Sequence, residues 1–162
     1  MEQKHKILPV RFSGNVKLED TMLFESEYHE NLQMDLNEKR EIVERSIVVW
    51  MFLGDKLVGE TYGIPTVELE DLEGSKVVDV EASEDSIYCY STTILLPWQR
   101  KGFGKILKAF WLGMVNVAFS LVVGHAGDCL ALNLLFGAKP LVERKNWYDT
   151  GKTYTYYEIN LK

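Results

Sequence analysis

The sequence holds few of the residues that build metal sites, disulfide frameworks or nucleic-acid surfaces. Its 162 residues include only two cysteines, Cys89 and Cys129, which form no CxxC pair, and three histidines that lack metal-ligand spacing. We therefore expect no metal ion and interpret the cysteines as reduced thiols of a cytoplasmic protein. Acidic residues outnumber basic ones by 24 to 18, and the net charge of −6 argues against broad nucleic-acid binding.

Long apolar runs are equally scarce. Residues 109–126 contain no Asp, Glu, Lys or Arg, but other polar residues interrupt them, whereas a membrane span needs about 20 residues of sustained apolarity. We predict a helix that ends near Asn116, followed by a buried strand over 117–123. The N-terminus also lacks the apolar segment of a signal peptide. We therefore expect no membrane partner.

What is present is typical of one globular domain covering residues 1–162. Hydrophobic residues make up 46% and charged residues 26% of the chain, and this length can bury a full core. Apolar patterning predicts strands over 7–12, 46–53, 57–62, 87–96, 117–123 and 154–161, and an irregular strand over 77–80. It predicts helices over 18–34 and 35–45, a helix that begins at the turn 102–104 and ends at 116, and a helix over 129–136. Asp35 and Glu38 show a capping-box pattern. We expect an α+β fold, a mixed central sheet of about six to seven strands flanked by about four helices.

The most informative segment runs from Ile94 to Lys105, with the sequence Ile-Leu-Leu-Pro-Trp-Gln-Arg-Lys-Gly-Phe-Gly-Lys. An apolar strand ends at its start, and a helical apolar pattern begins directly after its two glycines. The first amides of a helix have no intrahelical partner and lie at the positive end of the helix dipole. Arg100, Lys101 and Lys105 add formal charge there. The segment predicts a phosphate or pyrophosphate site; the alternative is that the glycines only permit a tight turn.

This turn and the order of elements resemble the GNAT superfamily of acyl-CoA-dependent N-acyltransferases. Residues 99–104, Gln-Arg-Lys-Gly-Phe-Gly, fit the family's Gln/Arg-x-x-Gly-x-Gly/Ala loop between a strand and an amphipathic helix. Residues 136–138, Phe-Gly-Ala, resemble the family's Leu-Gly-Phe segment, and residues 57–60 resemble its third strand. The likeness covers most of Ile47 to Leu161. It implies a GNAT-like sheet and acyl transfer from acetyl-CoA to an amine.

The resemblance also implies which residues bind acetyl-CoA. The loop would hold the pyrophosphate through backbone amides, and the strand before it would present amides to the pantetheine and the thioester carbonyl. The residues that the likeness assigns to acetyl-CoA are Ile94, Leu95, Leu96, Gln99, Arg100, Lys101, Gly102, Phe103, Gly104, Lys105, Asn133 and Phe136. Asn133 stands where the family often has a tyrosine that acts as general acid, and an amide cannot protonate a thiolate.

Three residues are candidates for proton transfer. Glu60 lies on the strand beside the expected acceptor cleft, although half of all strand positions face solvent. His125 follows the buried strand near the expected thioester and could accept a proton, although a single histidine there is more often structural. Tyr148 is a candidate to replace the missing tyrosine. Cys89 and Tyr90 should point to opposite faces of their strand, and we interpret Cys89 as a core thiol.

The amine acceptor is the least defined part of the prediction. Residues 65–85 are strongly acidic, with Lys76 as the only base, and should form the acceptor wall. They would either attract a cationic amine or form a solvated surface. We predict transfer of an acetyl group from acetyl-CoA to a primary amine of a small molecule or peptide by direct attack. The alternative is a GNAT-fold acyl-CoA sensor or scaffold without turnover. Whether the protein forms a homodimer is left open by the sequence.

Overall fold

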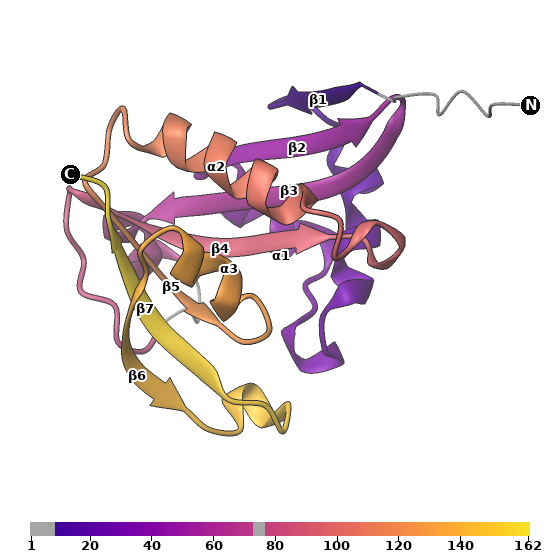
Figure 1. Cartoon of the computed structure of the whole chain (residues 1–162). Helices are drawn as coiled ribbons and strands as arrows, with labels where there is room; N and C mark the ends of the chain where they lie inside the picture. Colours follow the sequence, from indigo (N-terminus) through magenta and orange to yellow (C-terminus); the bar gives the residue numbers. More distant parts are fainter. Residues whose placement is uncertain (1–8, 73–76) are drawn as a thin grey trace, which may run out of the picture.

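A mixed seven-stranded sheet forms the centre of the computed structural model, which describes residues 9–72 and 77–162 (Figure 1). The strands lie in the order β1-β2-β3-β4-β5-β7-β6, and every neighbouring pair is antiparallel except β4 and β5. The strands are β1 Val10–Ser13, β2 Ile47–Leu53, β3 Lys56–Pro65, β4 Ser86–Ile94, β5 Leu121–Ala126, β6 Lys139–Arg144 and β7 Tyr154–Asn160. The prediction of an α+β fold with a mixed sheet is confirmed.

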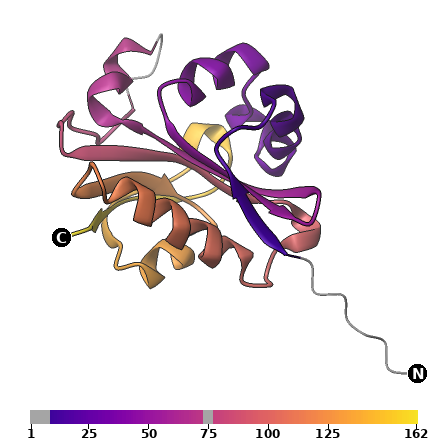
Figure 2. The same cartoon turned by 90° about the horizontal axis from the view of Figure 1, so that it is seen from above.

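Helical segments cover both faces of this sheet. The α-helices within the described ranges are α1 Leu36–Val43, α2 Phe103–Val115 and α3 Leu130–Leu135. Short 3-10 helices are η1 Leu18–Glu27, η2 Glu30–Leu32, η3 Thr66–Asp71, η4 Leu96–Trp98 and η5 Trp147–Asp149. Seen from above, η1 and α1 lie on one face, and α2 and α3 lie on the other (Figure 2). None of the helices in the described part of the chain has the length and apolarity needed to cross a bilayer.

Each face of the sheet has its own apolar cluster. Trp111 of α2 packs in one cluster with Met51 of β2, and both are fully buried. Ile42 of α1 packs in the other cluster with Tyr62 of β3. Because both faces are covered, β2 is a continuous apolar run, Ile-Val-Val-Trp-Met-Phe-Leu, as is typical of a buried strand.

Strand β4 contributes side chains to both clusters. Cys89 belongs to the cluster beneath α2, whereas Tyr88 and Tyr90 pack with the cluster beneath α1. The register between β3 and β4 shifts between Tyr62 and Gly63, so Tyr90 is the extra residue of a β-bulge. The prediction that Cys89 and Tyr90 point to opposite faces is confirmed.

The capping box of α1 is also confirmed. The Asp35 side chain accepts a hydrogen bond from the Glu38 amide at 2.9 Å, and the Glu38 carboxylate accepts one from the Asp35 amide at 2.8 Å. Two backbone donors at the helix start are thereby satisfied. The capping box therefore fixes the start of α1.

The single helix predicted over 18–34 is wrong. The segment forms η1 and η2 instead, and the backbone is extended at Tyr28 between them. The Tyr28 hydroxyl lies 2.5 Å from the hydroxyls of both Ser91 and Thr93 in β4. This contact ties the extended residue between η1 and η2 to β4.

The strand predicted over 117–123 begins later than expected. The amide of Phe119 still donates to the Val115 carbonyl at 3.0 Å, which prolongs the end of α2, so β5 starts at Leu121. His125 consequently lies inside β5 and not beyond it. The N-cap of α3 is Cys129, and the neighbouring Asp128 pairs with Lys152 at 3.0 Å.

Two other segments differ from the prediction. Residues 77–80 form no strand, because Asp79 has a left-handed φ of 74°, which a strand cannot contain. β6 was not predicted, because all its residues are exposed and Pro140 argues against a strand. Its place at the edge of the sheet permits both features.

Candidate active site

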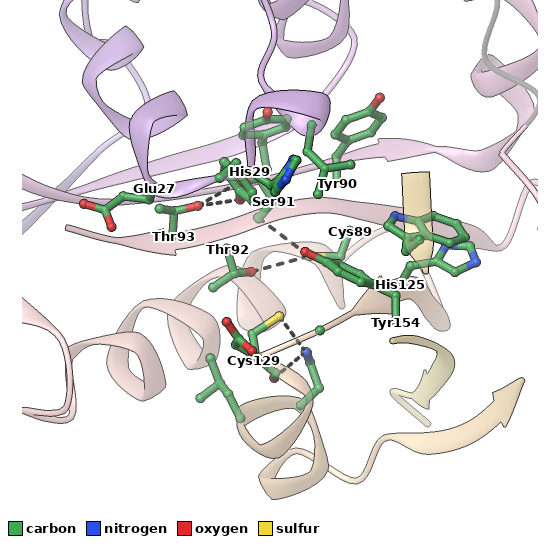
Figure 3. A pocket seen from close by; sticks show the side chains of 18 of the residues that line it. Glu27, His29, Cys89, Tyr90, Ser91, Thr92, Thr93, His125, Cys129 and Tyr154 are labelled. Carbon is green, nitrogen blue, oxygen red and sulfur yellow. Dashed lines mark hydrogen bonds between the residues drawn. The ribbon is translucent and has the colours of Figure 1, made fainter. Parts of the chain in front are cut away.

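The central feature of the site is a divergence between β4 and β5. These parallel strands pair only through Ser86–Leu121, Ile87–Val122 and Tyr88–Val123. Beyond this point β4 continues beside β3, and β5 continues beside β7. A cleft of about 1250 Å³ opens there. Figure 3 shows Ser91, Thr92 and Thr93 along one side of it, with Cys129 and Tyr154 on the other.

One end of the cleft is built from the start of α2. Gly102, its N-cap, has a φ of 87°, a left-handed conformation that favours glycine, and Arg100 has a φ of 59°. The first intrahelical bond is donated by Ile106, to the Gly102 carbonyl at 3.3 Å. The amides of residues 103–105 therefore have no partner within the helix. Such amides at the positive end of a helix dipole suit a phosphate group.

The three cations of this turn lie in different places. Arg100 and Lys105 line the cleft. Lys101 does not line it, and its ammonium lies 5.6 Å from the centre of the Trp98 ring. Gln99 donates a hydrogen bond to the Ile94 carbonyl at 2.8 Å, which ties the turn to the end of β4. Gln99 and Ile94 both line the cleft as well.

The backbone of 94–96 meets the cleft only in part. The Leu95 amide donates to the Val58 carbonyl at 3.0 Å, and the Leu96 amide donates to the Glu27 carboxylate at 3.0 Å. Neither residue lines the cleft. Because successive residues of an antiparallel strand direct their amides to opposite edges, Ile94 and Thr92 face the cleft edge instead.

Of the remaining residues assigned to acetyl-CoA, some line the cleft and others do not. Gly102, Gly104 and Asn133 line the cleft, whereas Phe103 and Phe136 pack against the cluster beneath α2. Asn133 is 1% exposed, and its side-chain nitrogen donates to the Cys129 carbonyl at 3.0 Å. Its side-chain oxygen has no hydrogen-bond partner among the described residues. A buried acceptor without a partner is rare in folded proteins.

Glu60 lies away from the cleft. It is 0% exposed and does not line the cleft. Lys39 pairs with its Oε1 at 2.8 Å and donates to its Oε2 at 3.1 Å, and the Trp50 indole donates to Oε1 at 2.9 Å. Burial, opposed by Lys39, raises the pKa of the carboxyl above its usual range. A carboxylate so enclosed cannot reach an amine in the cleft. Glu60 instead holds α1 on β3 through its ion pair with Lys39.

Tyr148 stands at the rim of the cleft. It is 57% exposed and has a left-handed φ of 45° within η5. The Asn31 side chain of η2 donates to its carbonyl at 3.0 Å, so η2 and η5 meet across the rim. The ring of Trp147 packs edge-on against that of Tyr148 with centroids 4.9 Å apart. The side chain of Tyr148 therefore has access to a ligand, unlike that of Glu60.

His125 lines the cleft from β5, and its side chain is only 2% exposed. Its Nδ1 lies 2.9 Å from the Tyr88 hydroxyl, and its Nε2 lies 3.0 Å from the Asp79 carboxylate. Burial lowers the pKa of the imidazole below its usual range, against the opposing effect of Asp79. His125 is thus a neutral ring at pH 7 with a polar partner on each nitrogen.

The acidic wall of the cleft comes from a different segment than predicted. Glu25, Glu27, Glu38 and Glu41 line the cleft, from η1 and α1. None of the acidic residues described in 66–72 and 77–85 lines it, which corrects the prediction for 65–85; Glu73 lies outside the described residues. The acidic residues that line the cleft therefore lie on the face of the sheet opposite to α2.

Sequence reasoning missed several polar groups of the cleft. These are Tyr88 and the hydroxyl cluster of Tyr28, Ser91 and Thr93. Asp79, which bonds His125, does not line the cleft and was missed as well. Strand alternation could have indicated Tyr88, which faces the same side as Tyr90. No sequence signal places Asp79, 46 residues away, beside His125. In the described part of the chain, no group of three or more His, Cys, Asp or Glu is placed to hold a metal ion.

Comparisons with known proteins agree with this geometry at the level of the fold. No protein-family model matches the sequence, and no curated protein shows significant sequence similarity to it. The structure is similar to the ribosomal-protein-S18-alanine N-acetyltransferase from Escherichia coli, with a TM-score of 0.73 and 12% identity over 95% of each chain.

Two further solved structures are also similar. NAA60 from Arabidopsis thaliana, in complex with a bisubstrate analogue, has a TM-score of 0.72 and 9% identity over 94% of this chain and 98% of that one. An acetyltransferase from Bacillus subtilis in complex with CoA has a TM-score of 0.65 and 14% identity over 96% and 99%. The divergent strands, the glycine turn before α2 and these neighbours together show that the chain has the fold of the GNAT N-acetyltransferases.

Proposed function

We propose that this protein transfers an acetyl group from acetyl-CoA to a primary amine of a small molecule or peptide. The observation that carries the proposal is the divergence of β4 and β5, because it opens a cleft with opposite charge at its two sides. One side holds the α2 amides with Arg100 and Lys105, and the other holds Glu25, Glu38 and Glu41. Two substrates of opposite charge can therefore meet between the strands.

The basic side suits the donor. The free amides of residues 103–105 and the Arg100 and Lys105 side chains would hold the pyrophosphate of acetyl-CoA. The pantetheine would then run along the open edge of β4, where the amides of Thr92 and Ile94 can bind it as a neighbouring strand would. Hydrogen bonds to the thioester carbonyl stabilise the negative charge that develops during attack.

The acidic side suits a cationic amine. Glu25, Glu38 and Glu41 line this side together with the rings of Tyr62 and Tyr90, which stack with centroids 6.0 Å apart. Carboxylates and aromatic faces both attract cations. An amine that carries a second positive charge should therefore be acetylated more efficiently than a neutral analogue.

A thiol-release assay tests the proposal. Purified protein is incubated with acetyl-CoA and a panel of amines that includes a diamine, a lysine-containing peptide and neutral primary amines. Release of CoA above the hydrolysis background supports the enzyme, and higher kcat/KM for the dicationic amines supports a cationic acceptor. Tight acetyl-CoA binding without release on any amine would contradict the enzyme and favour an acyl-CoA sensor.

A further inference from the structure

Two buried lysines of the protein differ in what surrounds their charge. Lys39 is paired with two carboxylates. Lys108 of α2 is 1% exposed, and among the described residues no carboxylate forms an ion pair with it. Its Nζ donates to Cys89 Sγ at 3.1 Å and lies 5.0 Å from the centre of the Trp111 ring. Because a buried charge without a counter-charge is costly, Lys108 favours a negative charge in its neighbourhood.

The ammonium of Lys108 lies directly behind the wall of the cleft. Cys89, which accepts its hydrogen bond, lines the cleft and is the first residue of β4 beyond the pairing with β5. Cys129, at the start of α3, lines the cleft from the other side (Figure 3). Burial raises the pKa of the Cys129 thiol, and the charge of Lys108 opposes this rise. The charge of Lys108 therefore acts on a thiol inside the cleft.

The proposed binding of acetyl-CoA brings a further sulfur to the same place. With the pyrophosphate at the start of α2 and the pantetheine along the open edge of β4, the thioester end lies at the divergence of the strands. There the Tyr157 hydroxyl fills the gap over β5, 2.8 Å from the position that a Cβ of Gly124 would take. The thioester sulfur would therefore stop beside Cys89, on the side of the sheet where Lys108 lies.

We infer that Lys108 is the counter-charge for the thiolate form of CoA, an inference that rests on the proposed acetyl transfer. The lone pair of a neutral amine forms the C–N bond, and the C–S bond then breaks with its electron pair left on sulfur. The resulting thiolate faces the Lys108 ammonium across Cys89. The proton that the nitrogen loses passes to water, so the charges balance and no proton has to reach the sulfur inside the cleft. Lys108 does not touch the thioester and acts through its charge.

The groups around this ammonium leave its charge available to a ligand. Burial raises the pKa of Cys129 and raises that of Tyr157 well above its usual range, so both are neutral at pH 7. A thiol proton on Cys89 has an acceptor of its own, the Ser91 carbonyl at 3.8 Å. The titratable and charged groups near the ammonium are Cys89 from β4, Cys129 from the start of α3, Tyr157 from β7, which is hydrogen-bonded to Cys89, and the exposed pair of Asp128 and Lys152 beside Cys129.

Binding of CoA and of desulfo-CoA, in which hydrogen replaces the thiol group, tests the inference without turnover. The Lys108 charge should lower the pKa of the bound CoA thiol by at least about one unit, which is a tenfold preference for the thiolate. The affinity for CoA should therefore rise up to about tenfold as the pH increases through the pKa of the bound thiol, whereas the affinity for desulfo-CoA should not. Calorimetry in buffers of different ionisation enthalpy should detect proton release with CoA alone.

Lys108→Met is compared with Lys139→Met to assign the effect. Both substitutions remove one positive charge, but Lys139 is exposed on β6 and does not line the cleft. Lys108→Met should bind CoA and desulfo-CoA with the same pH dependence and should lower kcat with acetyl-CoA about tenfold, which is the preference for the thiolate that it loses. Lys139→Met should keep the proton release and a kcat within about twofold of the wild type. Melting curves and desulfo-CoA binding verify that both variants fold.

The outcomes separate this inference from the acetyl transfer on which it rests. Equal pH dependence for CoA and desulfo-CoA in the wild type contradicts the inference alone, and this comparison needs no variant. Proton release that persists in Lys108→Met contradicts it as well. Proton release on CoA binding by a wild type that acetylates no amine contradicts the acetyl transfer and leaves the counter-charge in place. A wild type that does not bind CoA contradicts both.

Discussion

Lys39 Nζ lies 2.8 Å from Glu60 Oε1 inside the protein, and both side chains are fully buried. Lys39 also lies 3.4 Å from Glu25 and donates to the Thr21 carbonyl at 3.0 Å, so one ammonium joins α1, β3 and η1. Removing one partner of such a pair leaves an uncompensated charge in the interior. The same network supports the wall that carries the acidic side of the cleft.

We predict that Lys39→Met lowers the free energy of unfolding by about 3–5 kcal/mol. Its neighbour provides a matched control, because Arg40 pairs with Glu19 at 3.4 Å on the surface. Arg40→Met should cost at most about 1 kcal/mol. Urea denaturation of both variants measures the difference. Equal stability of the two variants would show that the buried network does not hold the helical layer.

A substitution at the start of α2 should abolish binding of acetyl-CoA. In Gly102→Glu, a carboxylate would stand where we place the pyrophosphate, at a φ of 87° that side chains rarely adopt. Gly113→Glu adds the same charge to the same helix, at a position where a Cβ meets nothing within 4 Å. Calorimetric titration with CoA should detect no binding to the first variant and normal binding to the second. Wild-type affinity in Gly102→Glu would show that CoA does not bind at the start of α2.

The three cations of the turn should contribute unequally to CoA affinity. We expect Arg100→Gln and Lys105→Gln each to weaken binding about tenfold, as for the loss of a hydrogen bond to a charged group. Lys101→Gln should change affinity little, because Lys101 lies against Trp98 outside the cleft. Dissociation constants at low and moderate salt check the ranking. A larger effect at Lys101 than at Arg100 would show that the phosphate lies on the other side of the turn.

His125 should make stability depend on pH in a defined window. Burial lowers its pKa in the folded protein below the ordinary value of about 6.5, so between these two values the unfolded chain binds a proton that the folded chain does not. The free energy of unfolding should therefore fall as the pH decreases through this window, by at most about 1.4 kcal/mol per pH unit. Below the folded pKa this decline should level off.

His125→Gln is the control for this pH dependence, because glutamine does not titrate. Urea denaturation from pH 7.5 to pH 5 should show a smaller decline in the variant than in the wild type. An identical decline in both proteins would mean that the pKa of His125 is not lowered by folding.

The sequence predicted the structure of the glycine turn and α2 far better than the structure of the opposite wall of the cleft. The glycine turn, α2 and the strand before it are adjacent in the chain, so local pattern predicts their structure. Even there, the amides expected at Leu95 and Leu96 bond to Val58 and Glu27, because the register of β4 depends on its pairing with β3. That register is a tertiary property.

The acceptor side depends on contacts between distant segments. Glu60 is on the strand that was expected, but its partner Lys39 decides that it is buried and ion-paired. His125 was a candidate from its position, whereas Tyr88 and Asp79 become its neighbours only through the fold. The acidic wall comes from η1 and α1 instead of 65–85, since charge in a sequence does not tell which segment reaches the cleft. β6 was not predicted, because an exposed edge strand has no buried face and therefore shows no alternation of apolar and polar residues.

Mass spectrometry of the acceptor tests acetyl transfer most directly. A dicationic primary amine is incubated with acetyl-CoA and either the wild type or Gly102→Glu, and the products are analysed. We predict that the wild type converts the amine to a product heavier by one acetyl group, at a rate above the uncatalysed reaction, and that Gly102→Glu does not. An unmodified acceptor in the presence of wild-type protein that binds acetyl-CoA, across dicationic and neutral amines alike, would contradict the proposed function.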